Sequence, residues 1–575
     1  MTQKIILQDA FKGFTLDQDK IISPGETIER FKKKLNKLDM NILKETKRID
    51  NGRLGIPVYF SICGSDAIKM TGTKKQMGKG ATSQQAEASA IMELAERFSF
   101  FSFCNDKNNF FTEKYSKLKD KAINFDMIAQ SVHDKSKELQ ITQKIFENLP
   151  LKWTWGYNMT MEKKVLIPFD WFYTINEFNG PCAGNCVEEA ISQGICEIVE
   201  RHVSSIISQN RLQVPVINGK TATDPMVLEM LTKYENNGIK LYLSDFSLDM
   251  GIPTVGILAY DPTTFPGQSE IVWTAGTTPD PQKALSRALT EVAQLAGDFN
   301  SSSNYIASGL PKFSKIEDAN FIIDHKTQIN ISALPDLADN NIKTEVLNLI
   351  NALEKKGMEV IVINTMHPEL KIPAFYTIIP GAHFRERAMG TSVGMFIAKI
   401  ITEKKDPAQA LKELKEMQDL LPKKYYLQFY LGSTHLTLND YKTAYEYFKK
   451  AMAFEPTPQD IPTIYSYMGI CLKDMGKYNK ALEILKKGVA FDNERTDIYN
   501  LMGFCHFKLK EHEKAIECFN QVLRLDPGSA IDYANIASNY RELGEKSMAI
   551  QYYEIALKLD PSIDFARINL DNLTK

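Results

Sequence analysis

Three segments of the chain place acidic, basic and amide side chains at the spacing of a helical face. Residues 78–100, 183–203 and 283–297 each read as an amphipathic helix, with an apolar side opposite a narrow polar side. The polar sides lack lysine, although lysine is abundant elsewhere in the chain. They carry Ser89, Glu93, Glu96 and Arg97 in the first segment, Glu189, Gln193, Glu197, Glu200 and Arg201 in the second, and Arg287, Glu291 and Gln294 in the third.

The string Glu-x-x-Glu-Arg occurs twice, at Glu93–Arg97 and at Glu197–Arg201. Carboxylates three residues apart on a helix lie within about 6 Å of each other. Two such helices brought together form a cluster of negative charge that needs cations if it is buried. Mg²⁺ binds carboxylate oxygens while keeping water and phosphates as other ligands, and arginine suits bidentate contact with phosphate. The repetition therefore indicates two related halves that meet at one magnesium–phosphate site.

A solvated outer face is the alternative interpretation of each segment. Glutamate and arginine on the polar side of an amphipathic helix are usually hydrated and paired at i, i+4, and one helix alone would be interpreted in that way. The pattern shared by three helices favours the buried site. The interpretation as a magnesium–phosphate site of an enzyme would fail if the following residues lay apart on the outer surface: Glu93, Glu96, Glu197, Glu200 and Glu291.

The elements that must position these residues lie in the first 403 residues. Short runs rich in β-branched and aromatic residues alternate there with the helical patterns, as expected for an α+β or α/β domain. The predicted strands are GIPVYFSICG, IKLYLSDF, IPTVGILAY, MEVIVIN and IPAFYTIIPG. We predict an α+β domain with internal pseudo-symmetry over residues 1–403, joined near residues 403–409 to a second domain over residues 404–575.

The second domain repeats itself. Small residues recur every 34 positions, and Asp-Pro closes the second helix of a unit. Each unit reads as two amphipathic helices, an arrangement that resembles the tetratricopeptide repeat. We predict four units from about Tyr425 to Pro561, capped by residues 562–575, in an all-α solenoid. The repeating positions are Gly469, Gly503 and Ala537, and Ala481, Ala515 and Ala549; Gly432 and Ala444 precede them by 37 residues.

Composition narrows the class of protein. Hydrophobic residues make up 43% and charged residues 24%, with a net charge of −2, so direct nucleic-acid binding is not indicated. No run of about 18 apolar residues suggests a membrane span, and the first residues do not resemble a signal peptide. The eight cysteines are irregularly spaced, which favours reduced thiols in the cytoplasm. The pair Cys182 and Cys186 lacks a second pair at metal-binding spacing, so we expect it to have a packing role.

The three helical motifs together resemble those of the YcaO family. They read SAIMELAER at 89–97, NCVEEAISQGICEIVER at 185–201 and RALTEVAQ at 287–294, in the family's order. The GKGAT stretch at 78–82, Lys20 and the TIERF stretch beginning at Thr27 also look like the family's. The resemblance covers roughly residues 15 to 385. It is particularly close to the stand-alone bacterial members, which also carry a helical C-terminal extension.

The resemblance implies ATP and Mg²⁺ as cofactors and a peptide or protein as substrate, whose backbone amide oxygen is phosphorylated and then replaced by a nucleophile. It implies Glu96, Glu200 and Arg201 as catalytic residues. It implies Mg²⁺ binding by Glu93, Glu96, Glu197, Glu200 and Glu291, and nucleotide binding by Lys20, Thr27, Ser89, Arg97, Asn185, Glu189, Arg201, Arg287 and Gln294. Such chemistry rests on positioning and charge neutralisation, without a protein nucleophile.

Two departures from the azoline-forming members bear on the substrate. The chain ends in DNLTK and not in a proline-rich tail, and no leader-peptide domain is visible at the N-terminus. We therefore expect a substrate other than an azoline precursor peptide. The resemblance to the stand-alone bacterial members suggests a role as accessory factor in β-methylthiolation of ribosomal protein S12. We expect the repeats to bind a partner protein or to self-associate, with a homodimer favoured. The alternative is a non-catalytic nucleotide-sensing adaptor whose repeats bind the partner.

Overall fold

The computed structural model describes residues 4–301, 305, 310–324, 326–384 and 392–575. Two compact units result from the contacts within the chain. The first comprises Met1–Lys135, Glu147–Ser303 and Ala307–Gly390, and the second comprises Ser136–Phe146 and Thr391–Lys575 together with Tyr305. Across the described part of the chain, no helix combines the length and the apolar character needed to cross a membrane.

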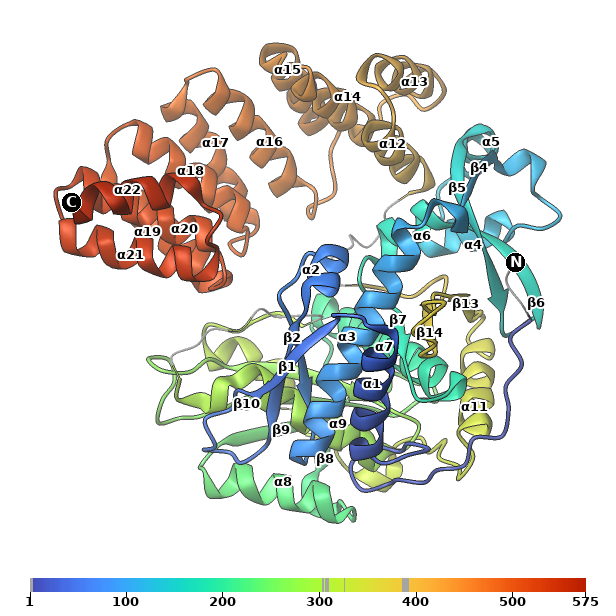
Figure 1. The fold of residues 1–575 in the computed structure, drawn as a ribbon. Helices are drawn as coiled ribbons and strands as arrows, with labels where there is room; N and C mark the ends of the chain where they lie inside the picture. The colour runs from blue at the N-terminus through green and yellow to red at the C-terminus, as the bar shows by residue number, and fades with distance from the viewer. Residues whose placement is uncertain (1–3, 302–304, 306–309, 325, 385–391) are drawn as a thin grey trace. The chain divides into compact units, whose positions relative to one another are not determined.

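The first motif helix, α3 (Ser83–Asn105), covers a three-stranded antiparallel sheet (Figure 1). Gly78 on its last strand lets the helix approach closely, because a Cβ there would lie 2.0 Å from the backbone nitrogen of Ala90. Helix α1 (Pro24–Leu38) adds Phe31 and Leu35 to the apolar core beneath α3. The strands run in the order β1 (Leu43–Arg48), β2 (Val58–Cys63) and β3 (Lys75–Lys79), with α2 (Ser65–Thr71) between the last two.

The second motif helix, α7 (Val187–Asn210), packs against a six-stranded antiparallel sheet. The sheet has the order β4-β5-β13-β14-β7, and β6 also pairs with β5. Sixteen of the 24 residues of α7 are buried, which explains why its polar residues must find partners within the protein. The elements are β4 (Phe111–Lys114), β5 (Pro150–Asn158), β6 (Lys163–Pro168), β7 (Pro181–Ala183), β13 (Ile361–Asn364) and β14 (Ala374–Ile378), with α4 (Phe125–Ser131), α6 (Phe169–Asn176) and α11 (Ile342–Glu354).

The third motif helix, α9 (Pro281–Ala296), packs against a five-stranded sheet of order β11-β10-β9-β8-β12. All pairs are antiparallel except β12 with β8. Gly276 repeats the role of Gly78, since a Cβ there would lie 2.5 Å from the carbonyl oxygen of Ala284. The elements are β8 (Val216–Asn218), β9 (Lys240–Asp245), β10 (Thr254–Tyr260), β11 (Val272–Thr277) and β12 (Gln328–Asn330), with α8 (Pro225–Asn236) and α10 (Asn320–Ile323).

The same strand–turn–helix unit therefore occurs three times in the first unit of the chain. In β3–α3, β7–α7 and β11–α9, three residues separate the strand from the helix, and the last of them caps the helix. Thr82 Oγ1, Cys186 Sγ and the Asp280 carboxylate each accept a backbone N–H of the first turn. The sequence indicated two related halves; the structure adds a third unit built in the same way.

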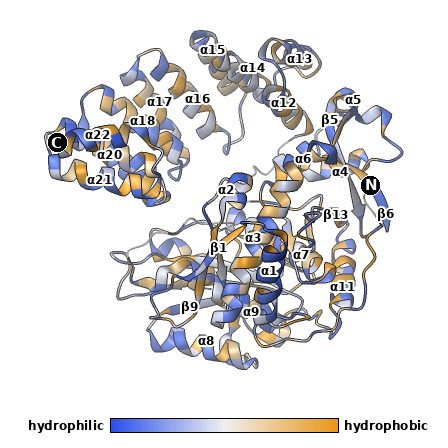
Figure 2. Cartoon of the chain, viewed as in Figure 1, coloured by the Kyte–Doolittle hydropathy of each residue, from blue (hydrophilic) through white to orange (hydrophobic). Residues whose placement is uncertain are grey.

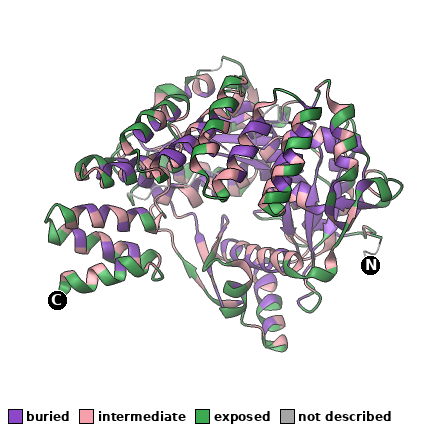
Figure 3. Cartoon of the chain, turned by 90° about the horizontal axis from the view of Figure 1, so that it is seen from above, coloured by how far each residue is buried: buried purple, intermediate pink, exposed green. Residues whose placement is uncertain are grey.

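The second unit is an array of helices. Short helices α12 (Val393–Lys404) and α13 (Pro407–Leu420) precede four antiparallel helix pairs and a final helix, as the 34-residue period predicted. Figures 2 and 3 show apolar, buried residues along one side of these helices and polar, exposed residues along the other. The pairs are α14 (Tyr425–Thr437) with α15 (Tyr441–Ala453), α16 (Ile461–Asp474) with α17 (Tyr478–Phe491), α18 (Thr496–Lys508) with α19 (His512–Leu525) and α20 (Ala530–Glu542) with α21 (Lys546–Leu559), followed by α22 (Asp564–Thr574).

Part of helix α5 (Leu139–Asn148) belongs to this second unit, although it lies far earlier in the chain. The Lys424 ammonium pairs with Glu138 at 2.7 Å. Gly394 in α12 leaves room for Thr142, whose Cγ2 would lie 3.2 Å from a Cβ at that position. The predicted boundary between residues 403 and 404 falls in the last turn of α12, whereas the contacts within the chain assign the whole of α12 to the second unit.

Candidate functional site

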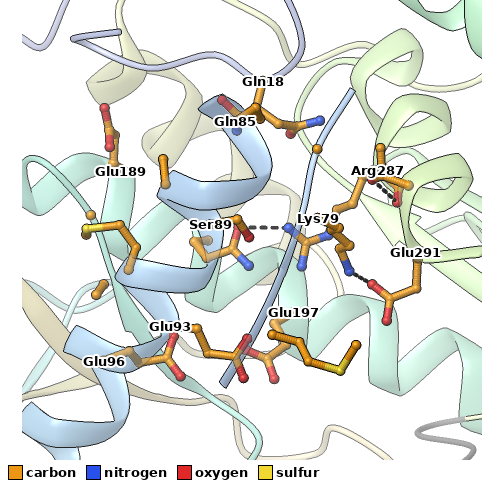
Figure 4. A pocket seen from close by; sticks show the side chains of 18 of the residues that line it. Gln18, Lys79, Gln85, Ser89, Glu93, Glu96, Glu189, Glu197, Arg287 and Glu291 are labelled. Carbon is orange, nitrogen blue, oxygen red and sulfur yellow. Dashed lines mark hydrogen bonds and ion pairs between the residues drawn. The ribbon is translucent and has the colours of Figure 1, made fainter. Parts of the chain in front are cut away.

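The first unit contains a cavity of about 520 Å³ between the three motif helices and the N-terminal arm, which is residues 4–23 before α1. Every residue that the sequence assigned to the site lines this cavity. Figure 4 shows the carboxylates of Glu93, Glu96 and Glu197 near one another, with Lys79 directed at Glu291. The lining residues are Lys20, Thr27, Ser89, Glu93, Glu96, Arg97, Asn185, Glu189, Glu197, Glu200, Arg201, Arg287, Glu291 and Gln294, together with Asp17, Gln18, Lys79, Gln85 and Gln193 among others.

The repeated unit explains why the glutamates meet. Glu93, Glu197 and Glu291 each lie eleven residues after the capping residue of their helix (82 to 93, 186 to 197 and 280 to 291). Equal distance from the cap places them at the same turn and on the same face of their helices. Three copies of one unit, each with its helix beside the cavity, thus contribute the same carboxylate three times.

Burial makes these carboxylates hard to ionise. Burial, with repulsion from neighbouring glutamates, raises the pKa of Glu93 and of Glu197 above the ordinary value of 4.5 and raises the pKa of Glu96 well above it. Burial opposes the charge of Arg97 as well, but Glu96, Glu93 and Glu197 outweigh it and raise the pKa of that guanidinium. With all of its carboxylates ionised, the cavity would carry more negative charge than its own cations neutralise.

Arginine side chains pair with two of the glutamates. Arg97 Nε lies 3.5 Å from Glu96 Oε1, and its Nη1 donates to the carbonyl oxygen of Phe178 at 3.3 Å. Arg287 Nε donates to Glu200 Oε2 at 3.4 Å, and the backbone N–H of Thr277 donates to the same oxygen at 3.2 Å. These contacts fix the direction in which each carboxylate enters the cavity.

Arg287 also joins two motif helices, because its Nη1 donates to Gln193 Oε1 of α7 at 3.0 Å. Gln193, Ser89 and Arg287 occupy the same position in the three units, seven residues after the cap (82 to 89, 186 to 193 and 280 to 287). A cation in one unit and neutral donors in the other two can therefore face a single anionic group.

The opposite part of the cavity is built around Glu189. Its Oε1 accepts the backbone N–H of Ile21 at 2.7 Å, and its Oε2 accepts the backbone and side-chain N–H groups of Asn185 at 2.9 and 3.1 Å. Thr27 Oγ1 donates to Asn185 Oδ1 at 3.2 Å. The N-terminal arm, with Lys20, is thereby held beside α7.

Lys79 and Asp17 are among the residues of the cavity that the sequence did not predict. Lys79 ends β3 and forms an ion pair with Glu291; burial and the positive charge of Arg287 lower its pKa to about 7. Lys79 lies within the GKGAT stretch, where a charged residue between two glycines could have marked it as a site residue. Asp17 is buried and accepts the Ala81 N–H and the Ser286 hydroxyl, each at 2.7 Å. No local pattern marks Asp17.

The donor set fits Mg²⁺, a hard cation that prefers carboxylate oxygens. Among the residues that the structure describes, no three histidine, cysteine or carboxylate side chains come close enough to form a ligand set. Three of the glutamates are paired with basic side chains: Glu291 with Lys79, Glu96 with Arg97 and Glu200 with Arg287. The raised pKa values of Glu93, Glu96 and Glu197 are what a cluster short of cationic charge should show. A divalent ion would relieve that shortage.

The two cysteines of the PCAGNC stretch lie in the framework of the site. Cys182 is buried, with Sγ 3.4 Å from the carbonyl oxygen of Phe375 and 3.6 Å from Thr377 Oγ1. Cys186 accepts the Glu189 N–H at the start of α7. Burial raises the pKa of both thiols, that of Cys186 to about 12. Both positions therefore hold thiols and not thiolates at neutral pH.

Comparison with known proteins agrees with this geometry. Residues 77–383 match the model of the YcaO cyclodehydratase family, described as ATP- and Mg²⁺-binding. Residues 429–530 match the tetratricopeptide domain of cytochrome c-type biogenesis protein H, and residues 533–563 match a tetratricopeptide repeat.

The sequence identity between this chain and individual relatives is low. A protein of Methanothermobacter thermautotrophicus is 24% identical over 383 residues, 63% of this chain and 94% of that one. The ribosomal protein S12 methylthiotransferase accessory factor YcaO of Escherichia coli is 30% identical over 134 residues, 23% of this chain and 22% of that protein. A solved heterocyclase in complex with substrate and cofactor shares the fold at a TM-score of 0.53 and 19% identity, covering 66% of this chain and 55% of its own. The family match spans more than half of the 575 residues and contains all three motif helices, so this chain is a member of the YcaO family that carries C-terminal tetratricopeptide repeats.

Proposed function

We propose that this protein uses ATP and Mg²⁺ to phosphorylate a backbone amide oxygen of a peptide or protein. One observation carries the proposal: six glutamates and three arginines from three helices line a single cavity in a chain of an ATP- and Mg²⁺-binding family. When bound, Mg²⁺–ATP would supply the phosphoryl group and the cation that the cluster lacks. An amide oxygen is a poor leaving group, and phosphorylation turns it into phosphate, which a nucleophile can displace.

The residues have distinct tasks in this proposal. The glutamates hold the metal from three sides, and the arginines neutralise phosphate charge as it develops. Glu96, Glu200 and Arg201 act closest to the reacting group. The metal ligands are Glu93, Glu96, Glu197, Glu200 and Glu291; the nucleotide contacts are Lys20, Thr27, Ser89, Arg97, Asn185, Glu189, Arg201, Arg287 and Gln294.

The test is Mg²⁺-dependent ATP turnover by the full-length protein and its Glu96→Gln and Glu200→Gln variants. We expect turnover in the parent and a loss of at least about 100-fold in either variant, since removal of one preorganised charge typically costs that much. Glu87→Gln is the matched control, because Glu87 lies on α3 but pairs with Lys32 and Thr46 outside the cavity. Equal turnover in all four proteins would refute the assignment.

The nucleophile and the substrate form a narrower proposal. The name of the Escherichia coli relative suggests an accessory role in methylthiolation of ribosomal protein S12. Mass spectrometry of the proteome with and without the gene would show a mass change on the S12 protein or on another substrate. An unchanged S12 mass would remove this narrower proposal while leaving amide activation in place.

A non-catalytic adaptor is the second candidate, favoured by the repeats at residues 429–563. It requires nucleotide binding without turnover, so the same assay separates the two functions. Self-association through the repeats is a further part of the proposal. Sedimentation of the full-length protein should give a homodimer, and a monomer at all concentrations would leave a different partner protein as the occupant of the repeats.

A further inference from the structure

Lys79 stands at a position where the other two units carry no charge. It lies three residues before the cap of α3, and the matching residues are Ala183 before α7 and Thr277 before α9 (82 to 79, 186 to 183 and 280 to 277). The three units agree in their glutamates, so the lysine is an addition to one unit. Its neighbours Gly78 and Gly80 pack too closely on α3 for a side chain, with hypothetical Cβ contacts of 2.0 and 2.6 Å.

The Lys79 ammonium reaches across the cavity to Glu291 of α9. Both side chains are largely buried, at 17% and 18% exposure. Leaving one member of a buried pair alone is costly, whereas removing both is far less so. The pair therefore holds β3 and α9 together while it satisfies a buried carboxylate.

Glu291 matches Glu93 and Glu197 in its unit, so it belongs to the set that the proposed function assigns to the metal. It cannot give its carboxylate fully to a divalent ion and keep the same contact with an ammonium. The positive charges of Arg287 and Arg201 also act against a second cation beside Lys79. Metal binding and the lysine pair compete for one carboxylate.

We propose that Lys79 is a built-in counter-ion that satisfies Glu291 in the metal-free enzyme and is displaced from it when the metal–nucleotide complex binds. The inference rests on the proposed function for the identity of the metal site. Lys79 is a positioning residue in this scheme: it keeps the acidic cavity folded between turnovers and sets a threshold for binding Mg²⁺ alone. Once displaced, its ammonium faces the phosphates, where a cation is useful.

The experiment uses the full-length protein with Lys79→Gln, Lys79→Arg, Glu291→Gln and the double variant. Thermal midpoints are measured in excess chelator and then against MgCl₂ without nucleotide. We expect Lys79→Gln to lower the midpoint in chelator and to need about fivefold less Mg²⁺ for half-maximal stabilisation. Lys79→Arg should behave as the parent, and the double variant should regain most of the midpoint.

An unchanged midpoint in chelator together with parent-like or weaker Mg²⁺ binding in Lys79→Gln would overturn the proposal. If Lys79→Gln does not fold, the double variant decides: a midpoint no higher than that of Glu291→Gln would also overturn it. None of these measurements depends on turnover. Failure of the ATPase assay would therefore remove amide activation but not the counter-ion role, and failure here would leave amide activation standing.

Discussion

The Glu189 carboxylate accepts the backbone N–H of Ile21 at 2.7 Å, across 168 residues of sequence. Its second oxygen accepts two N–H groups of Asn185. One side chain therefore connects the N-terminal arm, the β7–α7 turn and the cavity. Because Glu189 is buried, the arm is held by a contact that water does not readily replace.

Glu189→Gln should loosen the arm. Glutamine has one acceptor oxygen, and its amide N–H₂ would face the donors of either Ile21 or Asn185, so we expect a loss of about 1–3 kcal/mol at this contact. Hydrogen exchange of peptides covering residues 8–22 should accelerate, while the repeat helices keep their exchange rates. Unchanged exchange of the arm would show that its other contacts suffice.

Arg97→Lys should weaken nucleotide-dependent stabilisation. The guanidinium contacts both Glu96 and the carbonyl oxygen of Phe178, and a single ammonium cannot reproduce this fork. We expect the rise in thermal midpoint with Mg²⁺–ATP to shrink by at least half. Arg30→Lys is the control, because its i, i+4 pair with Glu26 is exposed. A parent-like shift in Arg97→Lys would argue against a role in the site.

Gly276→Ala should destabilise the first unit. The new Cβ would lie 2.5 Å from Ala284 O and 2.6 Å from Ala288 N, and both are backbone atoms that cannot move without shifting α9. We expect a cost of about 1–3 kcal/mol or more, seen as a lower thermal midpoint. At Gly267 the nearest atom would be 4.0 Å away, so Gly267→Ala should be nearly neutral. Equal midpoints for the two variants would contradict the close packing.

Acid should destabilise the first unit through a stack of histidines. The ring centroids of His133 and His383 lie 3.7 Å apart with an interplanar angle of 6°. The backbone N–H of His383 donates to His202 Nδ1 at 3.0 Å. Burial lowers the pKa of His383 to about 4 and that of His133 below its ordinary value of 6.5; His133 adds to the shift of His383, and Lys135 to that of His133.

A lowered folded-state pKa means that the stabilisation is complete above the unfolded value of 6.5 and is lost as the pH falls toward 4. We expect a loss of about 1–2 kcal/mol between pH 7.5 and 5, after allowing for partial exposure. His133→Asn should reduce this pH dependence, because it removes one titrating ring from the stack. Asparagine also accepts the left-handed backbone at φ 53°, so the substitution should not strain the chain. Thermal midpoints at both pH values test it; an equal acid-induced drop in parent and variant would exclude the stack as its cause.

The sequence predicted the parts with strong local patterns. All five predicted strands contain observed ones, β2, β9, β10, β13 and β14, and the 34-residue period located every helix pair of the repeats. The motif helices follow from their amphipathic spacing. The third strand–turn–helix unit was missed because its helix has Glu291 and Gln294 where the other two have Glu-x-x-Glu-Arg, and because none of the three strands β3, β7 and β11 was predicted.

The missed site residues depend on tertiary contacts. Asp17 lies outside the motifs and is defined only by its bonds to Ala81 and Ser286. Lys79 lies at the end of a strand, whereas the polar faces that predicted the site lie on helices. The pairing of Lys79 with Glu291 joins residues more than 200 positions apart, and spacing within one helix carries no information on it.

Residues 136–146 belong to the repeat-containing unit although they lie far earlier in the chain, and this has a consequence for engineering. An exchange of repeats between relatives that starts at α12 would leave this segment against a foreign surface, and Glu138 would lose Lys424. A functional chimera must carry the internal segment along with its C-terminal helices. The two units are interleaved along the chain, so the repeat-containing unit cannot be exchanged as one contiguous segment.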